Sequence, residues 1–361
     1  MNLKTAVSSS DGTAVLFYFP AAGQLNYPAA SQVGKFAFME IVQQLYARGK
    51  LLLTGEYAVL DGATALAVPT RLGQSLELVR ASLPYAGLRW RALDHRGDTW
   101  VDELLPVRLW GGGPAGEPTS ARSRLLQLLA AAEAIEPSCT HRLYGMDIIT
   151  RLEFDRAWGL GTSSTLVSNF ARLLEIDPYT LLEHTFGGSG YDIACATADA
   201  PLLYSRTPTG HTDVTEMPNW GPAWALRSHF VYRNRKQDSR AGMHAYRTAL
   251  RRRRDQGAEE PEIDLRIEIS VLTARLINSA APASAPPLEL LREHERLLSE
   301  LLDVPPIQKE LFPDFPGAVK SLGAWGGDFC WAISAEPAER VRTYFNERGF
   351  PTVLRWQDLV L

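Results

Sequence analysis

The pattern with the clearest chemical potential is a glycine and hydroxyl segment in the middle of the chain, residues 158–165, with the sequence WGLGTSST. Its glycines would let the backbone approach an anion closely, and its hydroxyls could hold phosphate oxygens or a magnesium ion. The apolar run Leu166 to Leu174 predicts a helix directly after it, whose N-terminus offers unpaired N–H groups and a positive dipole end. The segment, called the phosphate loop below, therefore predicts a phosphate-binding site.

A capped helix start is the alternative interpretation of this loop, because Thr and Ser are favoured N-cap residues in any context. The loop lacks the Gly-Lys-Ser/Thr ending of a Walker A motif, and Ser164 stands where a dinucleotide-binding loop has its third glycine. The choice between binding and capping therefore depends on the rest of the chain.

Two further segments accompany the phosphate loop. Residues 49–62 have the sequence GKLLLTGEYAVLDG, and residues 320–328 have the sequence KSLGAWGGD. With the phosphate loop they resemble, in order and spacing, the three signature motifs of the GHMP small-molecule kinases, the superfamily of galactokinase, homoserine kinase, mevalonate kinase and phosphomevalonate kinase. The resemblance covers about residues 48–361. It implies a two-domain α+β GHMP kinase fold, with a ribosomal protein S5 domain 2-like N-terminal domain and a ferredoxin-like C-terminal domain.

A fourth segment, GGSGYDIA at residues 187–194, lies between the phosphate loop and the last motif. In the mevalonate and phosphomevalonate branches a similar segment carries the catalytic aspartate, so the resemblance assigns that role to Asp192. The GYDIA string also resembles a GHMP subgroup named after it. At Tyr57, Tyr191 and Asp328 the sequence resembles phosphomevalonate kinases in particular. The resemblance thus implies an ATP- and Mg²⁺-dependent kinase of phosphomevalonate in isoprenoid precursor synthesis, with mevalonate kinase or a non-catalytic ATP- or metabolite-binding sensor as alternatives.

The resemblance also implies a role for each motif in phosphoryl transfer, which requires positioning and charge neutralisation rather than covalent chemistry. Asp192 would orient the acceptor, and Lys50 beside it would lower its pKa and neutralise the transferring group. ATP phosphates would bind to Gly159, Leu160, Gly161, Thr162, Ser163 and Ser164, with Ser163 or Ser164 on Mg²⁺. The small-molecule acceptor would contact Glu56, Ser189, Gly190, Gly323, Ala324, Gly326, Gly327 and Arg240.

Each assignment has a structural alternative. Asp192 could form a turn, and Lys50 could be a solvated charge at a strand edge. The presence of both residues argues against a sensor, because a sensor has no need of the pair. Glu56 could be a buried structural partner, and the last glycines could serve only a tight turn. Residues 233–240, RNRKQDSR, could be a solvated loop or could clamp an acceptor phosphate through arginine.

Some residues depart from the family pattern. Phe154 to Trp158 lack the proline that many members carry before the glycines, and Thr162 replaces a serine. Trp325 replaces a glycine, which predicts a narrower loop and a reshaped acceptor pocket. Glu183 is the sole candidate for the metal-binding glutamate of mevalonate kinases, and its spacing fits poorly. These departures leave the carboxylate metal ligand and the acceptor open.

The composition is that of a globular enzyme. The chain has 361 residues, of which 45% are hydrophobic and 22% charged, and it is long enough for two domains. A net charge of −4 and a pI near 6.0 argue against nucleic acid or an anionic membrane as partner. No apolar run approaches about 20 residues, so we expect no membrane span. Three widely spaced cysteines suggest a reducing, cytoplasmic compartment, and we expect a monomer or homodimer.

The elements that must position these residues follow from hydrophobic periodicity. We expect a helix after the phosphate loop that ends before Pro178, because proline cannot continue it. Other expected elements are strands at 51–54, 66–68, 75–80, 144–154, 230–232 and 329–333, and helices at 123–134, 179–186, 241–252, 263–278 and 288–302. The phosphate loop then lies at a strand-to-helix junction, which is the context that phosphate binding requires.

Residues 1–45 are expected to be an N-terminal extension. Residues 1–38 lack periodicity and Met39 is a more natural start, so we interpret them as an upstream translation start, with a signal peptide or an accessory extension as alternatives. We expect an ATP-binding domain at 46–206, a polar linker at 207–222 and a second domain at 223–361.

Overall fold

The structure is a computed structural model of the chain, which describes residues 40–81, 85–112, 118–207, 209–235, 239–280, 285–323, 325 and 328–361. The expectations for residues 1–39 lie outside the described residues. The chain divides into two units, Met1–Phe38 and Met39–Leu361, and everything below concerns the second.

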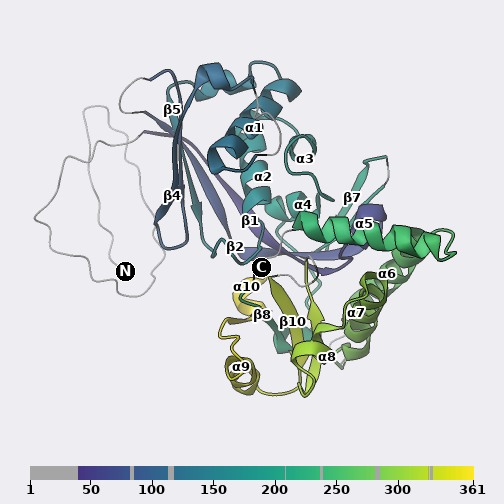
Figure 1. The fold of residues 1–361 in the computed structure, drawn as a ribbon. Helices are drawn as coiled ribbons and strands as arrows, with labels where there is room; N and C mark the ends of the chain where they lie inside the picture. The colour runs from purple at the N-terminus through teal and green to yellow at the C-terminus, as the bar shows by residue number, and fades with distance from the viewer. Residues whose placement is uncertain are drawn as a thin grey trace, which may run out of the picture. The chain divides into compact units, whose positions relative to one another are not determined.

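Seven strands of the described chain form the first sheet, in the order β4-β3-β5-β2-β6-β7 with β1 paired to β2 (Figure 1). β3 and β5 are parallel, and the other pairs are antiparallel. The strands are β1 (Ile41–Thr54), β2 (Ala65–Arg80), β3 (Gly87–Leu93), β4 (Thr99–Pro106), β5 (Met146–Leu152), β6 (Leu202–Arg206) and β7 (Thr212–Glu216). Thus residues 41–45 of the expected extension begin β1, and the expected linker contains β7.

Four helices cover one face of this sheet, namely α1 (Ala121–Ile135), α2 (Thr162–Leu174), α3 (Pro178–Glu183) and α4 (Tyr191–Thr197) (Figure 1). Apolar side chains of the sheet such as Trp90 and Ile148 pack against Leu128 and Phe170 of the helices. The expected start of α3 was one residue late. Pro178 is the first helical residue, where its missing N–H costs nothing, and Asp177 caps the helix through the N–H of Thr180.

Four strands of the described chain form the second sheet, in the order β11-β8-β10-β9, with antiparallel pairs throughout. They are β8 (Ser228–Tyr232), β9 (Gly317–Ser321), β10 (Phe329–Ser334) and β11 (Val353–Arg355). Helices lie between β8 and β9 and between β10 and β11, so the chain follows the β-α-β-β-α-β path of a ferredoxin-like fold. The helices of this half are α5 (Ser239–Asp255), α6 (Pro261–Asn278), α7 (Leu288–Leu302), α8 (Ile307–Leu311), α9 (Ala338–Asn346) and α10 (Trp356–Leu359).

The two sheets share a hydrophobic core. Leu51 and Val68 of the first sheet belong to one buried cluster with Phe230 and Trp331 of the second. A short 3-10 helix, η1 (Ala58–Asp61), follows β1 and joins a second cluster with α5, α6 and α7. The expected α+β class is confirmed. Among the described residues, no helix is both long enough and apolar enough to cross a membrane.

Candidate active site

The phosphate loop lies between β5 and α2, as the periodicity predicted. Gly159 and Gly161 have φ angles of 65° and 100°, a region that glycine adopts without strain. Gly161 is the N-cap of α2, and no side chain caps the helix there. The hydroxyls of the loop therefore do not have the capping role of the alternative interpretation. The first turn of α2 therefore presents backbone N–H groups at the end where the helix dipole attracts an anion.

The phosphate loop is attached to β1 by a backbone hydrogen bond. The Lys50 N–H donates to the Leu160 carbonyl at 3.0 Å, and the Leu160 side chain is fully buried. The hydroxyl of Ser164 donates to the Gly161 carbonyl at 3.0 Å, and that of Thr165 to the same carbonyl at 2.9 Å. These bonds tie the loop to β1 and to the first turn of α2.

A pocket of about 730 Å³ lies in front of the loop. Most of the predicted site residues line it: Lys50, Glu56, Gly159, Gly161, Thr162, Ser163, Ser164, Ser189, Asp192, Gly323 and Arg240. Leu160 and Gly190 are not part of the lining. Ala324, Gly326 and Gly327 lie outside the described residues. The structure thus gathers on one surface motifs that are far apart in the sequence.

Asp192 is the second residue of α4 rather than part of a glycine-rich loop. Burial raises the pKa of Asp192, although the charge of Lys50 lowers it. Burial lowers the pKa of Lys50, but nearby acidic groups, among them Asp192 and Asp328, raise it by more, so its net pKa lies above the ordinary value. A cationic lysine thus shares the pocket wall with an aspartate whose pKa is raised.

The Lys50 ammonium group is oriented by two contacts. It donates to the Gly159 carbonyl at 3.0 Å and lies 5.5 Å from the centre of the Tyr191 ring. Burial raises the pKa of Tyr191 to about 12, so this neighbour is neutral. The amine is therefore held between the phosphate loop and the start of α4.

Asp328 lies directly against the phosphate loop. A Cβ atom placed on Gly159 would lie 1.6 Å from the Asp328 Oδ2 atom. Residue 159 therefore has to be glycine for a second reason besides its backbone angle. Asp328 also brings a carboxylate to the wall that carries Lys50 and the hydroxyls of α2.

Glu56 lines the pocket but is fully buried in an ion cluster. Its Oε1 atom accepts from the Lys320 ammonium group of β9, and its Oε2 atom lies 3.2 Å from the His294 Nε2 atom of α7. Burial raises the pKa of Glu56 to about 7, although Lys320 lowers it. Glu295 completes the cluster by accepting from the Ser321 N–H at 3.0 Å and from its hydroxyl at 2.9 Å. These contacts are the ones expected if Glu56 is a buried structural partner.

Trp325 is buried away from the pocket lining. It packs in one cluster with Tyr57 and Tyr246, whose rings stack at 5.3 Å. The substitution of this tryptophan for glycine thus anchors the last motif against η1 and α5.

The pocket also contains cations that sequence reasoning did not single out. Arg124 of α1 lies 5.4 Å from the centre of the Phe186 ring, and Arg156 lies 3.8 Å from that of Trp100. Both arginines line the pocket together with Arg240 of α5. No sequence signal marks Arg124, because it occupies one position of an ordinary amphipathic helix.

Glu183, the expected candidate for a metal-binding glutamate, pairs with Arg206 and is not part of the pocket lining. The described residues hold no cluster of three or more His, Cys, Asp or Glu side chains arranged for a metal ion. The oxygen donors on the pocket wall include Asp192, Asp328, Ser163 and Ser164. Such a hard, incomplete oxygen set fits Mg²⁺ bound together with substrate phosphates, and does not fit a dedicated metal cage.

Comparison with known proteins gives a likeness in structure alone. No protein-family model matches the sequence, and no curated protein matches it either. L. major mevalonate kinase in complex with R-mevalonate is 14% identical, with 88% of this chain and 98% of that chain covered at a TM-score of 0.58. Streptococcus pneumoniae phosphomevalonate kinase in complex with phosphomevalonate and AMPPNP is 17% identical, with 87% and 100% covered at a TM-score of 0.61.

Lactococcus lactis galactokinase complexed with galactose is 12% identical, with 90% of this chain and 94% of that chain covered at a TM-score of 0.63. At such low identities the likeness establishes the fold and leaves the reaction open. The chain therefore has the fold of the GHMP small-molecule kinases, which its sequence motifs resemble.

Proposed function

We propose that the protein is an ATP-dependent kinase of a small metabolite and that its acceptor is phosphomevalonate. The observation that carries this proposal is the meeting of Lys50, Asp192 and the phosphate loop on one pocket wall. A sensor would need the loop, but it would not need a lysine and an aspartate beside it on the same pocket wall. The likeness to mevalonate, phosphomevalonate and galactose kinases supports the same reaction class.

The charge of the pocket supports an acceptor with more than one anionic group. Arg124 and Arg240 line the pocket in addition to Lys50, whereas the charge of Glu56 is offset by Lys320. Guanidinium groups bind phosphate and carboxylate in a bidentate manner. Phosphomevalonate carries both groups, whereas mevalonate carries the carboxylate alone, and galactose is neutral. We therefore favour phosphomevalonate over mevalonate as the acceptor.

In this mechanism the protein positions the reactants and neutralises charge. The N–H groups of the first turn of α2 bind the ATP phosphates, and Lys50 neutralises charge on the transferring group. Asp192 fixes the attacking oxygen in line with the transferred group. Because the attacking oxygen of phosphomevalonate belongs to a phosphate, Asp192 acts through electrostatics and position. With a hydroxyl acceptor, it would also take the proton.

Mg²⁺ would be held by the Ser163 or Ser164 hydroxyl and by the carboxylate of Asp328. When bound with ATP, it would offset the negative charge of the phosphates. Asp328 otherwise places a negative charge against the loop that binds the phosphates, which would weaken ATP binding. We therefore expect ATP affinity to depend strongly on Mg²⁺.

The proposal is tested by measuring ADP release from MgATP in the presence of phosphomevalonate, mevalonate, galactose or homoserine, each offered alone. We expect turnover with phosphomevalonate and a loss of about 10²-fold in kcat for Asp192→Asn, because the charge that fixes the attacking oxygen is lost. ATP binding to the same variant, measured by calorimetry, should be retained. Turnover with mevalonate alone would show that the acceptor is mevalonate and not phosphomevalonate. ATP binding without turnover on any acceptor would favour the sensor.

A further inference from the structure

The segment that leads into α4 has little intrinsic rigidity. Gly187, Gly188 and Gly190 have φ angles of 66°, 111° and 88°, and together with Ser189 they form the glycine loop in front of Tyr191. Glycine has the greatest backbone freedom in the unfolded chain, so a run of this kind is costly to order. Because Asp192 follows within two residues, its position depends on what holds this loop.

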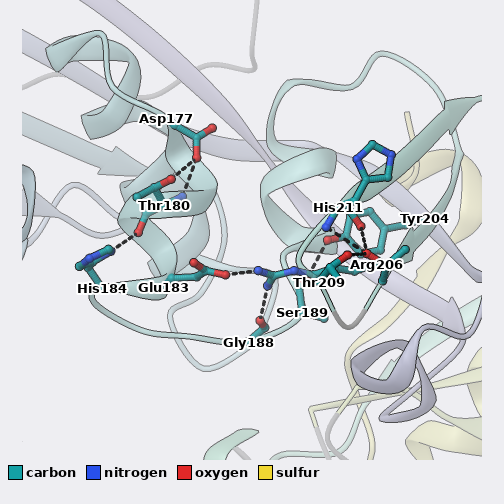
Figure 2. A network of polar contacts seen from close by, with 11 residues as sticks. Asp177, Thr180, Glu183, His184, Gly188, Ser189, Tyr204, Arg206, Thr209 and His211 are labelled. Carbon is teal, nitrogen blue, oxygen red and sulfur yellow. Dashed lines mark hydrogen bonds and ion pairs between the residues drawn. The ribbon is translucent and has the colours of Figure 1, made fainter. Parts of the chain in front are cut away.

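Two side chains of β6 bind the carbonyl groups of the glycine loop (Figure 2). The Tyr204 hydroxyl donates to the Ser189 carbonyl at 2.5 Å, and the Arg206 guanidinium donates to the Gly188 carbonyl at 3.4 Å. Burial raises the pKa of Tyr204, so its hydroxyl keeps the proton that it donates. Both contacts come from one strand, at alternate positions that share a face.

Contacts from α3 complete the arrangement. Glu183 pairs with the second nitrogen of the Arg206 fork, as Figure 2 shows, and the Gly187 N–H donates to the Leu182 carbonyl at 2.7 Å. A Cβ atom on Gly190 would lie 2.9 Å from the Tyr204 hydroxyl and 3.0 Å from the Tyr179 ring. The end of the loop at Gly190 therefore packs between α3 and β6.

The position of Arg206 is itself fixed by the turn that follows it. The Thr207 N–H donates to the His211 carbonyl at 2.8 Å, and the His211 N–H donates to the Thr207 hydroxyl at 3.1 Å. These bonds close the hairpin between β6 and β7 directly after Arg206. The guanidinium group is thus presented from a rigid strand end.

We propose that Tyr204 and Arg206 are positioning residues that hold the glycine loop, and through it Asp192 and Ser189, in the geometry for phosphoryl transfer. Neither side chain is part of the pocket lining, so they act through the loop. The inference rests on the proposed kinase function for its kinetic consequence. Its structural content, an ordered loop that depends on β6, stands independently of the reaction.

The first test compares the kinetics of Tyr204→Phe and Arg206→Lys with those of the wild type. The phenylalanine keeps the ring and loses only the donor, and the lysine keeps the charge but cannot bind Glu183 and Gly188 through one planar fork. We expect kcat to fall about tenfold in each variant, with the KM for ATP unchanged. Arg89→Lys is the matched control, because Arg89 forms a similar exposed strand-borne pair with Asp102 that is not part of the pocket.

The second test measures hydrogen exchange of the amides of residues 187–192 in the protein without ligands. We expect faster exchange in Tyr204→Phe and Arg206→Lys and wild-type exchange in Arg89→Lys. Unchanged exchange at 187–192 would overturn the proposal, as would a rise in the KM for ATP at constant kcat. If the wild type transfers phosphate to no acceptor, the proposed function fails, and the exchange result alone then decides whether β6 holds the loop.

Discussion

Replacing Lys320 by methionine should make the stability of the protein depend on pH in a range where the wild type does not. Lys320 and Glu56 are 1% and 0% exposed, and the ammonium group also donates to the Ser321 carbonyl at 2.9 Å. Methionine preserves most of the volume but leaves the Glu56 carboxyl group buried without its cation. Such a group avoids ionisation by keeping its proton.

The magnitude follows from the pKa of Glu56, which burial raises from 4.5 to about 7 in the wild type. A group whose pKa is higher in the folded than in the unfolded protein stabilises the folded protein at pH values below the unfolded pKa. That stabilisation is lost as the pH rises through the folded pKa. In the wild type the loss is about 3 kcal/mol and is nearly complete at pH 7. Without Lys320 the pKa rises further, towards the range of about 8–9 that isolated buried glutamates reach. The variant therefore loses about 2 kcal/mol more than the wild type between pH 7 and 8.5.

The assay is urea unfolding of both proteins at several pH values from 6 to 8.5. We expect the difference in unfolding free energy to be constant up to pH 7 and to grow by about 2 kcal/mol at pH 8.5. The double variant Glu56→Gln/Lys320→Met lacks the Glu56 carboxyl group and keeps only that of Glu295 in the cluster, so its difference from the wild type should grow by less. A difference for Lys320→Met that is constant across the whole range would refute the buried-pair reasoning.

The remaining predictions concern the pocket. Gly159→Ala should weaken MgATP binding by at least about tenfold in calorimetry, because a methyl group cannot fit against Asp328; binding at wild-type affinity would mean that the loop lies elsewhere. Arg124→Gln should raise the KM for phosphomevalonate about 10- to 100-fold and leave the KM for ATP unchanged, since a charge-assisted bond to the acceptor is lost; an equal rise in both would place Arg124 at the nucleotide. In pH profiles, kcat should be lost as the pH falls through the pKa of Asp192, which burial raises above the ordinary aspartate value; an acid limb that persists in Asp192→Asn would assign it to another group.

Local patterns predicted the strand, loop and helix around the phosphate loop, because periodicity and glycine chemistry act within one short segment. The helices α5, α6 and α7 were also expected within three residues of their ends. Strands β3 and β4 were not predicted, although β3 alternates between buried Leu88, Trp90 and Ala92 and the more exposed Arg89 and Arg91, which is a strand pattern. Asp192 was taken to lie in a glycine-rich loop, because the glycines before it gave no sign of the short helix that starts at Tyr191.

The contacts that hold the pocket together could not be predicted from the sequence. Glu56, His294 and Lys320 come from three elements that only the fold brings together, so no spacing rule links them. Arg206 occupies an ordinary strand position, and its partners Glu183 and Gly188 precede it by about twenty residues. Motifs thus identified the residues that face the pocket, whereas the side chains that position them required the structure.

The measurement that tests the central claim most directly is a phosphorus NMR spectrum of ATP, Mg²⁺ and phosphomevalonate incubated with the protein. Transfer to the acceptor predicts that the phosphomevalonate signal is replaced by two coupled diphosphate signals, with ADP formed in equal amount. ADP and inorganic phosphate with unchanged phosphomevalonate would show hydrolysis instead of transfer to this acceptor. An unchanged spectrum would show no reaction, and either result would contradict the account.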